Sequence, residues 1–573
     1  MFDDNLNLSK MDGVYLSILL IFSLVIIFKL INYHLSGGIS SPDKGAYLSS
    51  ALNLAGLDFY HISDPGEIYL SPTISFLTSV LFRLGFVEYS SILYVTAILG
   101  LFGIIGLYFL LRYQFDSMMS FTGTIVMLSF SIILWNLASG LLDFPAISMS
   151  ILIILFTVLA VNKNPKFFII IFPLFIIGFF TRYTVGFILP IIILYYLVNR
   201  DIIEKFDFLK SDRKKLKNQF LEYIKSSEFK YILISVIFGT ILLIIYCKVI
   251  HDIGSTLGFI NQSANSIAGT KGSKLAVDYS DDLLFYVKNF SDILYSAERR
   301  FDSTLAASLY LIISFGFIFK FWNIFKNRSK IFGTKQSFQT RNFDKFLKLL
   351  ILMSIFGIIL GIIVSKQLII NIFLLIAFTV FIGIIQKYNI DTKILTFFIL
   401  NLAWFLINLT YFSYYSIKTY RYIMPVIPSL IYFFVYSFNQ LFNLIKNKLK
   451  DFKIDVKYAN LIPILLIIFL MFSTVSFVDQ MGINQKTTDL KEVTQYIIDV
   501  DEDYHSKIIF SYDAHHRISR WYLNNFIIPI SDDTISWLDH VNADYVIYDK
   551  QLNLDNYDEI YHKGEVYLYA KAQ

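Results

Sequence analysis

Long apolar stretches recur along most of the chain and are separated by shorter polar segments. Residues 14–33, 231–250, 394–411 and 461–478 are examples. Each approaches the roughly 20 residues that cross about 30 Å of hydrocarbon as an α-helix. The alternation of apolar and polar residues that a membrane β-barrel requires is absent from these stretches. The pattern therefore predicts a polytopic α-helical membrane protein.

About thirteen membrane-spanning helices are predicted from these stretches. They fall near residues 14–33, 89–111, 118–136, 144–162, 167–181, 183–198, 231–250, 303–323, 348–364, 367–386, 394–411, 422–441 and 459–478. Residues 71–86, opened by Pro72, have helical apolar spacing but are too few to span. We expect a helix there that lies at the membrane interface or dips into the membrane as a half-helix.

The chain after residue 478 has a different composition, with polar residues between short β-rich runs. Residues 507–512, 544–548 and 565–569 predict strands, and residues 490–500, 515–523 and 534–540 predict helices. Two domains follow from this pattern. A transmembrane domain covers residues 1–478 and includes a long loop, 34–88, with interfacial helices, and a small extracytoplasmic α/β domain covers residues 479–573.

The placement of charge predicts the orientation. The chain of 573 residues is 56% hydrophobic and 16% charged, and lysines and arginines gather in the loops 200–230 and 326–348. Such loops favour the cytoplasm. The amino terminus is then cytoplasmic, whereas the loops 34–88, 137–143, 251–302 and 412–421 and the C-terminal domain lie outside. Orientation and contact with anionic lipid account for the basic loops, so we expect the lipid bilayer as a partner and no nucleic acid.

Five short motifs lie on the predicted outer face in a fixed order. They are Ser41-Pro42-Asp43-Lys44-Gly45-Ala46-Tyr47, Tyr69-Leu70-Ser71-Pro72, Leu142-Asp143-Phe144-Pro145-Ala146, Thr181-Arg182-Tyr183, and Tyr420-Arg421-Tyr422-Ile423-Met424-Pro425-Val426-Ile427-Pro428. In this order, and with about thirteen spans and an outer soluble domain, the chain resembles the GT-C fold membrane glycosyltransferases. Within them it is similar to the protein mannosyltransferase family 39 and to the lipid A aminoarabinose transferase.

That resemblance implies a transferase that moves a sugar, hexose or pentose, with inversion from a polyprenyl phosphate. The carrier is dolichyl phosphate in archaea and eukaryotes, and the acceptor is a protein, lipid or glycan outside the cytoplasm. Asp43, at the family position, would be the catalytic base, because a hydroxyl is a poor nucleophile until a carboxylate accepts its proton.

The donor phosphate or sugar would be bound by cations and neighbouring polar groups, since the phosphate leaves as a dianion. The candidates are Lys44, Tyr47, Asp143, Arg182, Tyr183, Arg421, Tyr422 and Arg300, with Arg299 beside the last. Many relatives have a second acid where this chain has Lys44, which changes the charge of the site.

Several of these residues also have a purely structural interpretation. The side chain of an arginine at the end of a span commonly extends so that its guanidinium lies at the membrane surface. Asp43 and Asp143 each precede a predicted helix and are suited to capping it. For Asp143 the two interpretations are balanced, whereas the motif order favours a chemical role for Asp43.

The sequence predicts no cofactor and leaves a divalent metal undetermined. Glu67 and His61 are weak ligand candidates in the first outer loop, but no His-x-x-x-His spacing appears among the outer histidines. The single cysteine, Cys247, lies in an apolar run, which excludes a disulfide framework within the chain.

A transporter or flippase of lipid-linked glycans is the alternative from another class of protein. It would favour charged positions at mid-membrane and an internal repeat, whereas Asp43, Asp143, Arg182 and Arg421 are predicted at one interface. An oligosaccharyltransferase is a third interpretation, but no two of the five tryptophans are adjacent, as its Trp-Trp-Asp signature requires.

Overall fold

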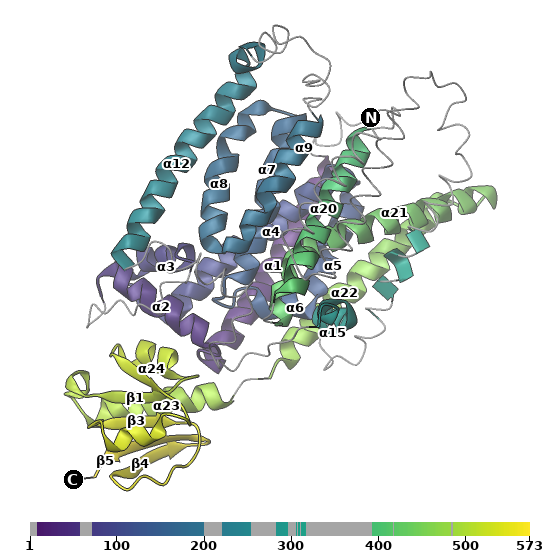
Figure 1. Cartoon of the computed structure of the whole chain (residues 1–573). Helices are drawn as coiled ribbons and strands as arrows, with labels where there is room; N and C mark the ends of the chain where they lie inside the picture. The colour runs from purple at the N-terminus through teal and green to yellow at the C-terminus, as the bar shows by residue number, and fades with distance from the viewer. Residues whose placement is uncertain are drawn as a thin grey trace.

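The computed structural model describes residues 9–57, 71–199, 221–253, 282–295, 392–415, 418–482 and 485–572, with a few residues between 305 and 316. The predicted spans at 348–364 and 367–386, most of the span at 303–323, and most of the two basic loops lie outside these residues. Helices account for nearly all of the described chain before residue 500 (Figure 1).

The predicted apolar stretches form helices. Their bounds are α1 (Lys10–Gly37), α2 (Pro42–Ala55), α3 (Thr73–Arg83), α4 (Tyr89–Arg112), α5 (Ser117–Ser129), α6 (Ser131–Asn136), α7 (Asp143–Asn162), α8 (Phe168–Thr181), α9 (Ile188–Asn199), α12 (Ser227–Ile253), α14 (Phe285–Lys288), α15 (Phe290–Leu294), α20 (Thr392–Tyr414), α21 (Ile427–Asp451) and α22 (Leu461–Gln480). Short 3₁₀ segments η2 (Pro165–Phe167), η3 (Tyr183–Phe187), η4 (Tyr420–Val426) and η5 (Val456–Asn460) precede α8, α9, α21 and α22. Within the described chain, seven helical segments are long and apolar enough to cross a membrane.

One predicted span is wrong in detail. Residues 118–136 were expected to form a single helix, but Phe130 adopts an extended conformation, with φ −71° and ψ 125°, and divides α5 from α6. The helix predicted within residues 71–86 is confirmed as α3, and its position at the membrane interface stays a prediction.

Helices α4 and α7 pack closely because one face of α4 consists of glycines. A Cβ added at Gly103 would lie 2.1 Å from the Oγ of Ser148, and one at Gly100 would lie 3.1 Å from the ring of Phe144. Small residues at this spacing let helix backbones approach within a membrane. Asp143, the first residue of α7, is thereby held at a defined depth against α4.

The opposite end of the bundle is fixed by a buried charged network. Asp12, at the start of α1, is fully buried and accepts hydrogen bonds from Tyr108 Oη and Arg112 Nε, each at 2.6 Å. Arg112 also donates to the second Asp12 oxygen at 3.0 Å and to the carbonyl of Phe115 at 2.8 Å. A buried ion pair is stable when hydrogen bonds satisfy it in this way.

The C-terminal part forms the predicted small α/β unit. Helices α23 (Gln485–Val500) and α24 (His516–Leu523) accompany a five-stranded sheet, with 3₁₀ segments η6 (Tyr504–Ser506) and η7 (Ile535–Asp539). The strands are β1 (Ile509–Tyr512), β2 (Ile527–Ile530), β3 (Tyr545–Tyr548), β4 (Tyr557–Lys563) and β5 (Val566–Lys571), in the order β2-β1-β3-β5-β4. Strands β2, β1 and β3 are parallel, whereas β5 is antiparallel to β3 and to β4. The sequence predicted β1, β3 and β5 and missed β2 and β4.

This C-terminal unit lies directly against α2 (Figure 1). A Cβ added at Gly45 would be only 2.5 Å from the carbonyl oxygen of Arg517, so α24 approaches the backbone of α2. Thr487 Oγ1 donates to the carbonyl of Gly37 at 2.6 Å, and Tyr522 Oη accepts from Ile39 N at 3.2 Å. We call this end of the bundle, where α2, α3 and the sheet lie, the domain end.

Candidate active site

Four charged residues from four different elements meet at the domain end. Asp43 lies in the first turn of α2, and Asp143 is the first residue of α7. Arg182 follows the last residue of α8, and Arg421 lies in η4. We call these four residues the charged cluster.

Local sequence explains why each side chain reaches the cluster. Pro42 is suited to the first helical position and starts α2 directly before Asp43. Gly140, with φ +80°, makes the turn that lets α7 begin three residues later, and its N–H donates to Thr96 Oγ1 at 3.1 Å. Arg182 is extended, with φ −160°, between α8 and η3, so its side chain leaves the helix end.

The charges of the cluster alternate in sign. Arg421 Nη2 donates to Asp43 Oδ2 at 2.7 Å, and Arg421 Nη1 lies 3.8 Å from Asp143 Oδ2. Arg182 Nη1 pairs with the other oxygen of Asp143. The chain of contacts therefore runs Asp43, Arg421, Asp143, Arg182.

Exposure differs along this chain of contacts. The side chain of Asp143 is only 4% exposed, whereas those of Asp43 and Arg421 are 28% and 31% exposed. The buried carboxylate of Asp143 holds both arginines, whereas Asp43 and Arg421 are partly open to solvent.

Tyrosines surround the cations. The ring of Tyr422 lies 5.1 Å from the guanidinium of Arg182 and 5.7 Å from that of Arg421, within the range of cation–π attraction. Tyr47 is 5% exposed and close enough to Asp43 and both arginines to interact electrostatically with them, and burial raises the pKa of its hydroxyl. The predicted residues Tyr47 and Tyr422 therefore belong to the same site as the charged cluster.

Lys44 is not brought to the cluster. Its side chain is 2% exposed, and its ammonium donates to Ser40 Oγ at 2.8 Å. Lys44 interacts electrostatically with His34 of α1, and burial lowers the pKa of Lys44 to about 7. Asp43 and Tyr47 share one side of α2 because they are four residues apart, whereas Lys44 points elsewhere.

The remaining predicted residues have different outcomes. The ring of Tyr183 packs on Phe179 and Phe180, at 5.3 and 6.4 Å. Arg300, Arg299, Glu67 and His61 lie outside the described residues, as do Tyr69 and Leu70 of the second motif. Within the described part of the chain, no group of three His, Cys, Asp or Glu side chains is arranged to hold a metal ion.

Sequence reasoning missed two further tyrosines at the site. Tyr286 and Tyr415 both interact electrostatically with Arg182, and the ring of Tyr415 lies 5.6 Å from that of Tyr422. The hydroxyl of Tyr286 donates to the carbonyl of Thr419 at 3.1 Å, next to η4. The signal for Tyr415 was present, because Tyr411, Tyr415 and Tyr422 form a dense tyrosine run directly before and within the last motif.

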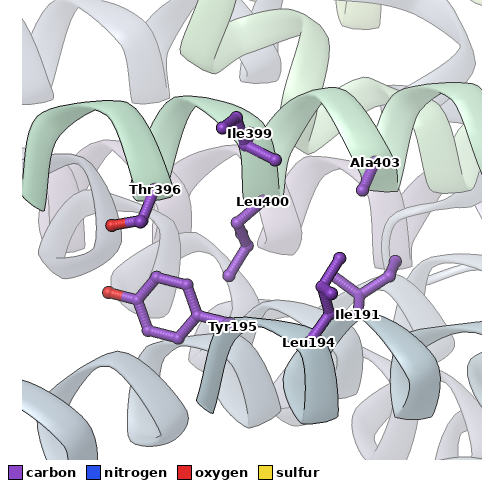
Figure 2. A pocket seen from close by; sticks show the side chains of 7 residues that line it. All are labelled: Ile191, Leu194, Tyr195, Thr396, Ile399, Leu400 and Ala403. Atoms are coloured by element: carbon purple, nitrogen blue, oxygen red, sulfur yellow. The ribbon is translucent and has the colours of Figure 1, made fainter. Parts of the chain in front are cut away.

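An apolar pocket lies between α9 and α20, further along the bundle. Figure 2 shows side chains of the two helices facing each other across it. Its lining residues are Ile191, Leu194, Tyr195, Thr396, Ile399, Leu400 and Ala403. Nearer the domain end, Phe187, the last residue of η3 before α9, lies with its ring 4.3 Å from that of Tyr411 in α20.

The fold and the site together define a polytopic membrane protein with an ionic cluster at the helix ends, on the side where the C-terminal α/β unit lies. The family model of dolichyl-phosphate-mannose-protein mannosyltransferases matches residues 70–209, a segment that contains Asp143 and Arg182. No curated protein matches the chain by sequence.

Two solved structures share the architecture. ArnT from Cupriavidus metallidurans, bound to undecaprenyl phosphate, is similar with a TM-score of 0.53 and 11% identity, over 97% of this chain and 98% of that chain. The archaeal oligosaccharyltransferase AglB from Archaeoglobus fulgidus, in complex with an inhibitory peptide and a dolichol-phosphate, gives a TM-score of 0.50 and 12% identity, over 93% of this chain and 69% of that chain. The chain thus has the GT-C fold and resembles the protein mannosyltransferases and ArnT.

Proposed function

We propose that this protein is a glycosyltransferase that moves a sugar from a polyprenyl phosphate to an acceptor hydroxyl at the domain end. The observation that carries the proposal is the charged cluster, in which a partly exposed carboxylate, Asp43, is paired with a partly exposed arginine, Arg421. The orientation predicted from charge puts this end outside the cytoplasm.

Asp43 is suited to the role of general base. It is exposed enough to meet an acceptor and is held by Arg421 at 2.7 Å. In the proposed step Asp43 takes the proton of the acceptor hydroxyl, and the oxygen attacks the anomeric carbon as the bond from that carbon to the phosphate oxygen breaks. The sugar is transferred with inversion, and the polyprenyl phosphate leaves as a dianion.

The two arginines are suited to the phosphate. A guanidinium carries five N–H donors in a planar fork, so Arg421 can keep its pair with Asp43 and still donate to a phosphate oxygen. Asp143 is buried between Arg421 and Arg182 and keeps both guanidinium groups oriented. Fixed cations of this kind stabilise the charge that develops on a leaving phosphate.

The apolar side chains of α9 and α20 that face each other lie along the direction that the lipid part of the donor would take. Ile191 and Tyr195 follow Arg182 by nine and thirteen residues, through η3 and the start of α9, which at about 1.5–2 Å per helical residue corresponds to about 14–26 Å. A polyprenyl chain attached to a phosphate at Arg182 would extend along this direction into the membrane. The ArnT neighbour binds undecaprenyl phosphate, which supports a polyprenyl carrier here.

The test is sugar transfer and release by purified protein in lipid vesicles, with a radiolabelled panel of polyprenyl-phosphate sugars. Asp43→Asn is the test variant, and Asp479→Asn is the matched control, because Asp479 pairs with Lys29 at the same end of the bundle but apart from the cluster. We expect turnover of at least one donor, a loss of about 10²- to 10⁴-fold in Asp43→Asn, as for a general base, and little change in the control.

Binding of the radiolabelled polyprenyl phosphate separates the roles of the residues. It should survive in Asp43→Asn and weaken in Arg421→Met. Full turnover by Asp43→Asn would refute the role of this carboxylate. If the purified protein moves lipid-linked glycan across the vesicle membrane and transfers no sugar, the alternative function, a flippase, is supported instead.

A further inference from the structure

The sheet of the C-terminal unit has a topological switch point. From β1 the chain crosses through α24 to β2 on one side, and from β2 it returns to β3 on the other side of β1. In open sheets with parallel strands, ligands bind outside the carboxyl ends of the strands at such a point. Here that point lies between the ends of β1 and β3.

Polar and aromatic side chains gather at these strand ends. Tyr512 and Tyr548 end β1 and β3 with their rings 5.1 Å apart, and Tyr548 Oη donates to Asp532 at 2.7 Å. Asp549 follows β3 and accepts from Lys486 of α23 at 3.3 Å. We call Tyr512, His515, Asp532, Tyr548 and Asp549 the carboxyl-edge cluster.

His515 is the member of this cluster that points to a ligand. It is 9% exposed, and neither of its ring nitrogens has a hydrogen-bond partner among the described residues. The ring of His515 lies 5.9 Å from that of Tyr512, and the imidazole interacts electrostatically with Asp549 and Lys486. A buried imidazole normally has at least one partner, because an unpaired buried polar group costs free energy.

The chemistry of the cluster favours hydroxyl groups. Burial lowers the pKa of His515, so the imidazole is neutral at pH 7 and has one donor and one acceptor nitrogen, which a hydroxyl can match. Carboxylates accept hydrogen bonds from sugar hydroxyls, and the partly exposed ring of Tyr512 can pack on the apolar face of a pyranose, whereas Tyr548 is fully buried and supports Tyr512 from below. Asp513, Asp532, Asp533 and Asp549 follow the ends of β1, β2 and β3. Lys486 pairs with Asp549 and Lys550 with Asp532, so carboxylates remain in excess and disfavour an anionic ligand.

The position of the cluster relates it to the active site. Helices α24 and α2 run in the same direction, because Arg517 lies against Gly45 and Asn524 donates to the carbonyl of Leu57 at 3.5 Å. His515 is two residues before Arg517, just as Asp43 is two residues before Gly45. The carboxyl-edge cluster is therefore at the same end of α2 as the proposed base.

We propose that the carboxyl-edge cluster binds a hydroxyl-rich saccharide of the acceptor and presents it to Asp43. This inference rests on the proposed function, and it names the acceptor as a glycan or a glycan-bearing molecule. His515 and Asp549 bind the saccharide and take no part in the chemical step.

The first experiment measures saccharide binding by the full-length protein in nanodiscs on an array of neutral and amino oligosaccharides, with a basic peptide as the competing class. The variants are His515→Gln and Asp549→Asn. The control is His562→Gln, because His562 is an exposed histidine of the same sheet that pairs with Glu559 at 2.9 Å. We expect at least one oligosaccharide to bind, a tenfold or greater loss of affinity in both test variants, and no change in the control. Thermal unfolding of each variant verifies that it is folded.

The second experiment measures release of the sugar to water, without acceptor, from the donor that turns over. We expect it to be unchanged in His515→Gln and Asp549→Asn and lost in Asp43→Asn, with the KM for acceptor raised in the first two. Saccharide binding that both variants retain, binding of the basic peptide alone, or no binding to the array would overturn the inference. Absence of any Asp43-dependent turnover would refute the proposed function instead, and the array would still report on the cluster.

Discussion

Replacing Lys44 by methionine should stabilise the folded protein at neutral pH. The side chain is 2% exposed, and its ammonium donates to Ser40 Oγ at 2.8 Å. Burial lowers the pKa of Lys44 from its ordinary 10.5 to about 7. The folded protein therefore binds this proton more weakly than the unfolded chain does, and the charged form opposes folding.

The size and the pH dependence of the effect follow from the two pKa values. The difference between 10.5 and about 7 corresponds to about 5 kcal/mol, at about 1.36 kcal/mol for each pKa unit. Between pH 7 and 10.5 the unfolded chain holds more protons, so this contribution to the stability of the wild type rises with pH. The gain in free energy of unfolding from Lys44→Met should be greatest below pH 7 and should vanish near pH 10.5. The lost hydrogen bond to Ser40 reduces this gain by about 1 kcal/mol.

The assay is thermal unfolding in detergent at pH 6, 8 and 10, followed by tryptophan fluorescence. Lys491→Met is the matched control, because Lys491 is an exposed lysine of α23, and its Tm difference from the wild type should not vary with pH. A Tm of Lys44→Met that equals that of the wild type at pH 6, or an advantage that grows as the pH rises, would refute the reasoning.

Three further predictions concern single side chains. Gly45→Ala should lower glycosyl transfer about 10- to 100-fold, because its Cβ would lie 2.5 Å from a carbonyl oxygen of α24 and displacements near 1 Å cost rates of that size. Gly13→Ala, whose Cβ would meet nothing within 4 Å, is the control, and equal rates for both variants would contradict the prediction. Asp143→Asn should lower the free energy of unfolding by about 3–5 kcal/mol, because it leaves a buried arginine without its carboxylate; an unchanged denaturation midpoint would count against this. Asp12→Asn should destabilise the protein similarly but leave the turnover per folded molecule unchanged, which active-site titration checks.

Periodicity in the sequence predicted most of the helices because a lipid environment requires long apolar runs whose backbone is satisfied within each segment. It could not predict the break at Phe130, since the apolar pattern continues through that residue and only the backbone conformation changes. In the C-terminal unit, β2 and β4 were missed. Strand β2 contains Pro529, and β4 carries the charged residues Asp558, Glu559 and Lys563, as expected of edge strands.

The sequence by itself determined the class of protein, the order of the motifs and the prediction that Asp43, Asp143, Arg182 and Arg421 share one end of the bundle, because span counting assigns each loop to a face. Only the tertiary structure decided which of them touch. Arg421 joins the two carboxylates, although it is 378 residues from Asp43, and Lys44, adjacent in sequence, turns to Ser40 and away from the cluster. Because direction around a helix changes by about 100° per residue, spacing shows that Lys44 and Asp43 face different sides of α2. What each side meets depends on the packing of distant segments, which a local sequence pattern does not give.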